Sequence, residues 1–227
     1  MDMIRTIEGL RTALSTDLVK TETELNDKFS LLAKSLFNNF QIMKGERFYW
    51  MTEVEFYLYH DGHRDIITYP RNCEAGMWFF HASGVDISFE SKVEFKENER
   101  NHKLMPYLTK DAVFGGILLR GVVLAESNAT PVSGPMKVCD ELFDLFDAFA
   151  APTNFPQIVE ATVPRNVAFK KGFPEKRYGL NPNPAKKVQD ILSYNYSDID
   201  AEQLTKDELV KGYEDYLVAK YRFIASE

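Results

Sequence analysis

The chain has 227 residues, of which 44% are hydrophobic and 27% are charged, so it suits one globular domain and is not a disordered chain. It shows no signal peptide and no apolar run of membrane-spanning length, and we therefore expect a cytoplasmic protein with no membrane partner. Its formal net charge of −7 argues against a generic nucleic-acid binder, because phosphate contacts require a basic surface.

Apolar residues at helical spacing predict two helices within the first forty residues. Ile4, Ile7 and Leu10 recur in the first helix, and the second covers about residues 26–36. Both patterns are typical of packing helices. We treat residues 1–30 as an N-terminal helical segment and residues 31–227 as the main domain.

Residues 47–59 alternate with period two, which predicts a strand. Its predicted core face carries Phe48, Trp50, Val54, Phe56 and Leu58, whereas Tyr49, Met51, Glu53, Glu55, Tyr57 and Tyr59 fall on the other face. The two acids lie about 7 Å apart among aromatic neighbours. This pattern favours a cleft for a flat ligand. The alternative is a half-exposed strand with two solvated acids.

A loop follows from residue 60 to residue 76, and a second alternating strand is predicted from Gly84 to about Phe95. The charged segment 96–102 is typical of a loop. Residues 113–124 are apolar except for Arg120, which predicts a strand covered on both faces.

Pro135 is placed to begin a helix that would continue through Leu145 to Phe149. Residues 152–187 are rich in proline and predict extended loop with short strands. Ser197 and Thr205 each resemble a helix start. The last helix, at about residues 206–216, precedes a short apolar strand at residues 221–224.

Arg120 is the second candidate functional residue, because burying an arginine without a partner is costly. Glu55 or Glu53 on a neighbouring strand is the expected partner. The alternatives are a structural ion pair or an arginine that emerges at a strand end. Cys73 and Cys139 define no disulfide framework, and a lone His-x-x-His is a weak zinc signal. We therefore expect neither a metal nor a cofactor.

Seven short motifs follow one another along the chain: residues 32–36, 52–58, His63 with 70–72, 85–87, 118–120, 133–139 and 220–223. This ordered set resembles the alkyladenine (3-methyladenine) DNA glycosylases of the mammalian and Bacillus type. The resemblance covers most of residues 30–225. Its most specific part is Ser-Gly-Pro-Met-Lys-Val-Cys at residues 133–139.

The resemblance implies an α+β single domain, with a curved, mostly antiparallel, barrel-like sheet flanked by helices. It also implies a monofunctional enzyme that hydrolyses the N-glycosidic bond of a damaged purine rotated out of duplex DNA, as in base excision repair. Glu55 would be the general base that activates water, and Arg120 would hold that water and the carboxylate. The implied pocket residues are Tyr57, His63, His81 and Asp86. The candidate phosphate contacts are Arg71, Lys137, Lys170 and Lys171.

The chain departs from the family in three places, so we expect a divergent member. His81 stands where the family has a second stacking tyrosine, and Asp86 replaces an asparagine with a charge that repels phosphates. Ala82-Ser83-Gly84 replaces a longer hairpin whose tyrosine fills the gap in the DNA.

Two alternatives stay open. One is a non-enzymatic protein that binds a nucleobase or another small molecule, and the other is a hydrolase of free nucleosides. The partner is accordingly damaged DNA or a small nucleobase-like ligand. The segment 165–187, with seven basic residues against one acid, is the candidate phosphate-facing surface.

Overall fold

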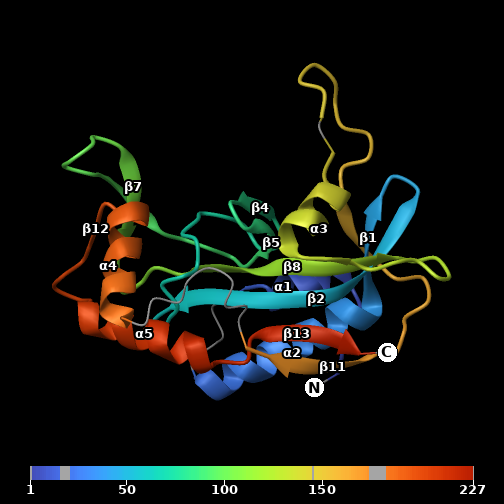
Figure 1. Ribbon diagram of the computed structural model, residues 1–227, viewed down its shortest axis with the longest axis horizontal. Helices are drawn as coiled ribbons and strands as arrows, with labels where there is room; N and C mark the ends of the chain where they lie inside the picture. Colours follow the sequence, from blue (N-terminus) through green and yellow to red (C-terminus); the bar gives the residue numbers. More distant parts are fainter. Residues whose placement is uncertain (1, 16–20, 145, 174–182, 227) are drawn as a thin grey trace.

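The computed structural model describes residues 2–15, 21–144, 146–173 and 183–226. Among them, strand β2 (Arg47–His60) lies along the long axis of the molecule and organises a ten-stranded sheet (Figure 1). One edge of β2 pairs antiparallel with β8 (Phe114–Leu124). The other edge is shared in turn by β1 (Phe40–Lys44), β13 (Arg222–Ser226) and β3 (His63–Arg64).

The remaining strands extend this curled antiparallel sheet. Next to β8 lies β5 (Gly84–Ser88), followed by β4 (Trp78–His81), and β9 (Val132–Ser133) also joins β8. Strand β10 (Gln157–Glu160) pairs with β1, and β11 (Ala168–Gly172) pairs with β13. A separate three-stranded sheet contains β6 (Glu94–Glu97), β7 (Leu104–Leu108) and β12 (Asp198–Ile199).

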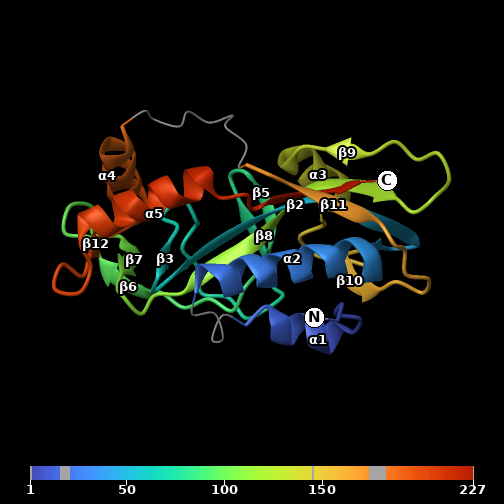
Figure 2. The ribbon, with the colours of Figure 1, turned by 90° about the horizontal axis from the view of Figure 1, so that it is seen from below.

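Helices α1 (Ile7–Ala13) and α2 (Glu22–Asn39) lie on one side of the main sheet (Figure 2). A capping box between Thr21 and Glu24 begins α2. Phe29 of α2 then stacks on Phe56 of β2 with ring centroids 4.4 Å apart, inside the main core. Burying each such side chain contributes about 1.5–3 kcal/mol. The expected boundary at residue 30 falls within α2.

Helix α3 (Pro135–Leu142) packs on β5 and β8 on the opposite side of the sheet from α2 (Figure 1). Helices α4 (Pro184–Asn195) and α5 (Lys206–Val218) pack on each other at one end of β2. They enclose a second apolar cluster, in which Tyr59 stacks on Phe114 at 4.8 Å. The described chain is therefore one α+β domain. None of its helices combines the length and apolar character needed to cross a bilayer.

The predicted core face of β2 is correct only for its second half. Val54, Phe56 and Leu58 are buried, but Tyr49 and Met51 occupy the core before them, and Phe48 is 41% exposed. The cause is a paired irregularity, since Thr52 of β2 and Arg120 of β8 both lack a register partner. On each strand, the side chains therefore switch to the opposite face of the sheet at this point. Because each strand has one extra residue, the pairing register between the strands is the same before and after the irregularity.

Three further predictions were wrong. The strand that begins at Gly84 ends at Ser88, and a separate strand starts at Glu94. The helix that begins at Pro135 ends at Leu142, because Phe143 turns away to pack edge-on against Phe80 at 4.7 Å. The expected helix start at Ser197 is instead the approach to β12, because its N–H bonds Pro106 of the neighbouring β7.

Helix α4 was missed because its prolines suggested a loop. Pro184 occupies the first helical turn, where a missing N–H costs nothing, and the Asn183 side chain accepts a hydrogen bond from the N–H of Lys186. The predicted start of α5 at Thr205 is confirmed by a second capping box. Leu145, Glu175, Lys176 and Arg177 lie outside the described residues.

Candidate functional site

A pocket of about 740 Å³ opens beside β2, between the β4–β5 hairpin, α3 and the two C-terminal helices. Four tyrosines line it, namely Tyr57, Tyr69, Tyr213 and Tyr216. Among the described residues of its lining, the cationic side chains are Arg71, Arg120, Lys137 and Lys187, and Asp86 is the single acid. The volume lies within the 300–1,000 Å³ that small-molecule sites occupy.

Glu55 lies directly behind this lining and is only 1% exposed. Its Oε1 accepts hydrogen bonds from the hydroxyls of Tyr57 at 2.8 Å and Tyr216 at 3.0 Å. Its Oε2 faces Nη1 of Arg120 at 3.1 Å as an ion pair. The carboxylate therefore reaches the pocket through these three neighbours, all of which line it.

Arg120 joins two buried carboxylates. Its Nε donates to Oε1 of Glu53 at 2.9 Å while its Nη1 faces Glu55, and Arg222 donates to the same Glu53 oxygen at 2.7 Å. The irregularity in β8 makes this possible, because Arg120 is the extra residue at that position. Gly121 is needed beside it, since a Cβ there would lie 2.5 Å from Oγ1 of Thr52.

Burial raises the pKa of Glu55 above its usual value, because a charged carboxylate is poorly solvated there. The positive charge of Arg120 and the hydrogen bonds from Tyr57 and Tyr216 oppose this rise. Burial also raises the pKa of both tyrosines well above 10, so they remain hydrogen-bond donors at neutral pH. A carboxylate with a raised pKa is a stronger proton acceptor than an ordinary glutamate, which suits the role of a general base.

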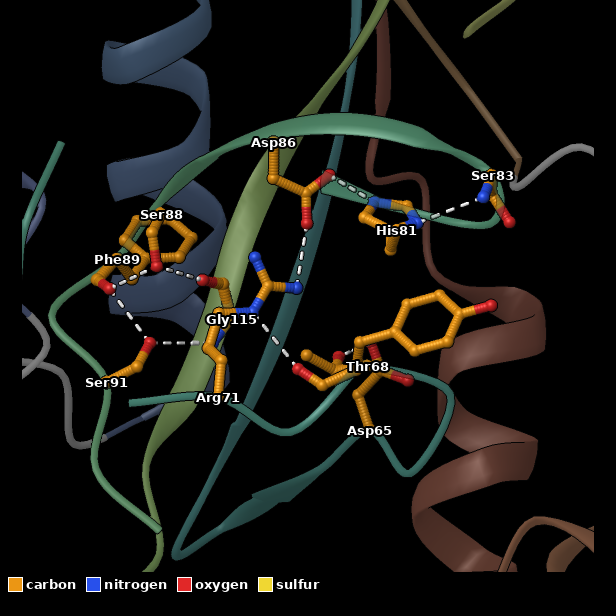
Figure 3. A network of polar contacts seen from close by, with 11 residues as sticks. Asp65, Thr68, Arg71, His81, Ser83, Asp86, Ser88, Phe89, Ser91 and Gly115 are labelled. Carbon is orange, nitrogen blue, oxygen red and sulfur yellow. Dashed lines mark hydrogen bonds and ion pairs between the residues drawn. The ribbon is translucent and has the colours of Figure 1, made fainter. Parts of the chain in front are cut away.

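Asp86 lies between Arg71 and His81 on the wall of the pocket (Figure 3). Its Oδ2 pairs with Nη2 of Arg71 at 2.8 Å, and its Oδ1 lies 2.9 Å from Nε2 of His81. The N–H of Ser83 donates to Nδ1 of His81, so a neutral imidazole can donate its Nε2 proton to Asp86. Gly116 makes room for the pair, because a Cβ there would lie 2.8 Å from Cβ of Asp86.

This network changes the electrostatic effect expected of Asp86 in the site. Sequence reasoning expected its charge to repel phosphates, but Arg71 neutralises it within the wall. Arg71 is itself 3% exposed and lies over the ring of Phe79 at 3.7 Å. Its guanidinium therefore orders the pocket wall and is not presented on an outer surface.

The structure brings together most of the expected site residues. Those that line the pocket are Tyr57, Arg71, His81, Asp86, Arg120 and Lys137, with Glu55 behind them. Lys170 and Lys171 lie apart from it on β11. The candidate phosphate contacts therefore do not share one surface.

His63 lies in a different place. It lines a second cavity of about 820 Å³ between α2, β3 and α5, together with Lys171. Its Nδ1 pairs with Glu22 at 3.2 Å, and its ring lies edge-on to Tyr221 at 5.5 Å. The hydrogen bond from His63 contributes most to lowering the pKa of Glu22 to about 2. These contacts give His63 a structural role between α2 and the sheet.

Sequence reasoning missed the residues that the C-terminal helices supply to the pocket. Tyr213 and Tyr216 come from α5, and Lys187 comes from α4. Tyr216 is 161 positions away from the carboxylate that it contacts, and no local pattern announces such a pairing. Arg222 did carry a signal, because it belongs to the last of the recognised motifs.

Among the residues that the structure describes, no group of three or more His, Cys, Asp or Glu side chains is arranged to hold a metal ion. No family model, curated protein or solved structure matches this chain.

Proposed function

We propose that the protein is a divergent N-glycoside hydrolase, related to the alkyladenine glycosylases, which binds a purine-like base in this pocket. The observation that carries the proposal is the position of Arg120, which lines the pocket and also contacts Glu55 at 3.1 Å. A carboxylate with a raised pKa thus lies behind a concave, tyrosine-lined surface and is linked to it by the hydroxyl of Tyr57 at 2.8 Å. A general base must be within hydrogen-bond reach of the proton it accepts, and here Tyr57 provides that connection.

In the proposed reaction the water lies beside Arg120 and the hydroxyl of Tyr57. Its oxygen attacks the anomeric carbon as the C–N bond breaks through an oxocarbenium-like transition state. The water proton passes to Oη of Tyr57, while the Tyr57 proton passes to Oε1 of Glu55 over 2.8 Å. The base departs with the bonding electron pair and takes a proton from solvent.

Base release tests the proposal. The protein is incubated in excess with single-stranded and duplex DNA carrying hypoxanthine or 3-methyladenine, and with the corresponding free nucleosides. We expect base release from at least one substrate, lost in Glu55→Gln and strongly reduced in Tyr57→Phe, while both variants stay folded. Release from none of these substrates would rule out the hydrolase.

A second candidate function is binding of a nucleobase-like ligand without turnover. The nearly complete burial of Glu55 favours it, because Oε1 already accepts two hydrogen bonds, Oε2 faces Arg120 as an ion pair, and Glu55 does not itself line the pocket. This candidate predicts ligand-dependent thermal stabilisation that Glu55→Gln leaves in place, with no base released.

A further inference from the structure

The pocket carries more positive charge than its buried ion pairs neutralise. Arg71 pairs with Asp86, and Arg120 is held between two glutamates. Lys137 and Lys187 also line the pocket, and neither has an acidic side chain within 4 Å among the described residues. Two positive charges are thus left over in a protein whose net charge is −7.

These two lysines come from different helices. Lys137 lies in the first turn of α3, and Lys187 lies in the first turn of α4. Unpaired lysines usually spread over the outer surface, where solvent screens them. Two that line one concave surface match an anionic group, which can accept charge-assisted hydrogen bonds from both.

The rest of the lining suits the remainder of such a ligand. The rings of Tyr57, Tyr69, Tyr213 and Tyr216 offer faces and edges to a flat base, and about 740 Å³ accommodates a ligand of nucleotide size. The β4–β5 hairpin turns through only Ala82 and Ser83, so it has no large side chain at its tip to fill a gap in a duplex.

We propose that the substrate class of this pocket is a free purine nucleoside monophosphate, with the phosphate held between Lys137 and Lys187 and the base among the tyrosines. The hydrolytic step rests on the function proposed above, whereas recognition of the phosphate does not. Binding and cleavage are therefore measured separately.

The experiment compares inosine 5′-monophosphate with inosine, by calorimetric titration and by thermal shift at 50 mM and 300 mM salt. We expect the nucleotide to bind about 10–100-fold more tightly at low salt, with a smaller difference at high salt. The double variant Lys137→Gln/Lys187→Gln should lose this difference while it keeps its affinity for inosine. Lys170→Gln is the matched control, because this exposed lysine lies on β11 outside the pocket, and it should bind the nucleotide like the wild type.

Equal affinity for nucleotide and nucleoside in the wild type would overturn the proposal, and so would a nucleotide preference that survives in the double variant. A duplex that displaces inosine 5′-monophosphate at equimolar concentration would also overturn it, in favour of a DNA substrate. Lysine-dependent binding of the nucleotide without release of hypoxanthine would support the phosphate site and would show that the bound nucleotide is not hydrolysed. The two proposals can thus fail independently.

Discussion

Replacing Arg120 tests how the centre of the site is held together. The side chain is 6% exposed and lies against Glu53 and Glu55, which are 8% and 1% exposed. Arg120→Met preserves most of the volume but leaves Glu55 as a buried charge without its cation. Breaking one side of such a pair costs about 3–5 kcal/mol of unfolding free energy. For a domain of this size, that corresponds to a fall in Tm of roughly 6–20 °C.

The loss of unfolding free energy in Arg120→Met should depend on pH. The pKa of Glu55 in the folded state is already raised above its unfolded value, and removing Arg120 raises it further. The folded state then holds the Glu55 proton more tightly than the unfolded state does. The contribution of Glu55 to stability is therefore fully present below its unfolded pKa, and it falls by about 1.4 kcal/mol for each pH unit between the unfolded and the folded pKa.

Urea denaturation at pH 5 and pH 8 measures this effect. We expect Arg120→Met to be clearly more destabilised at pH 8 than at pH 5. The double variant Glu55→Gln/Arg120→Met should recover part of the loss at pH 8, because no buried charge is left unpaired. If Arg120→Met at pH 8 lies within 1 kcal/mol of the wild type, Arg120 does not hold Glu55 in the way described.

Three further predictions concern the surroundings of the site. Gly116→Ala should lower stability by about 1–3 kcal/mol in thermal denaturation and weaken ligand binding, because its Cβ would crowd Asp86 and Arg71. Gly172→Ala is the control and should be close to neutral in the same assay, because its Cβ would meet nothing nearer than 3.9 Å. Asp65 is fully buried, and burial raises its pKa to about 6. Its contribution should therefore favour the folded state below its unfolded pKa and decline by roughly 3 kcal/mol as the pH rises through about 6. Asp65→Asn should remove that part of the measured pH dependence of stability. Phe56→Ala should cost about 3–5 kcal/mol in urea titrations, whereas Phe149→Ala should change stability by less than about 0.5 kcal/mol, because Phe149 is completely exposed.

The sequence supports the long strands and most of the helices, because their periodic patterns are governed by burial. The strand at residues 114–124 and the final helix are correct on this basis. The switch of faces along β2 could not be predicted, since it depends on paired irregularities at Thr52 and Arg120, which lie on different strands. Helix α3 ends early for a similar reason, because a distant aromatic contact overrides the local pattern.

The candidate site, too, could be predicted from the sequence only in part. The pairing of Arg120 with Glu55 and Glu53 followed from the cost of burying an arginine, and the structure contains both contacts. The compensation of Asp86 by Arg71 could not be predicted, because it depends on a loop residue and on the space left by Gly116 on the neighbouring strand β8. The tyrosines of α5 were missed because that helix carries only a packing pattern in the sequence.

The most direct test of the proposed hydrolase compares Glu55→Gln with Glu53→Gln. The two changes remove the same charge from one strand, and both acids contact Arg120, but only Glu55 contacts the pocket tyrosines. Release of hypoxanthine from inosine 5′-monophosphate and from hypoxanthine-containing DNA is followed at enzyme excess. We predict a fall of about 10²–10⁴-fold for Glu55→Gln and a far smaller one for Glu53→Gln. Equal loss in the two variants, or no release by the wild type from either substrate, would contradict the assignment of Glu55 as the base.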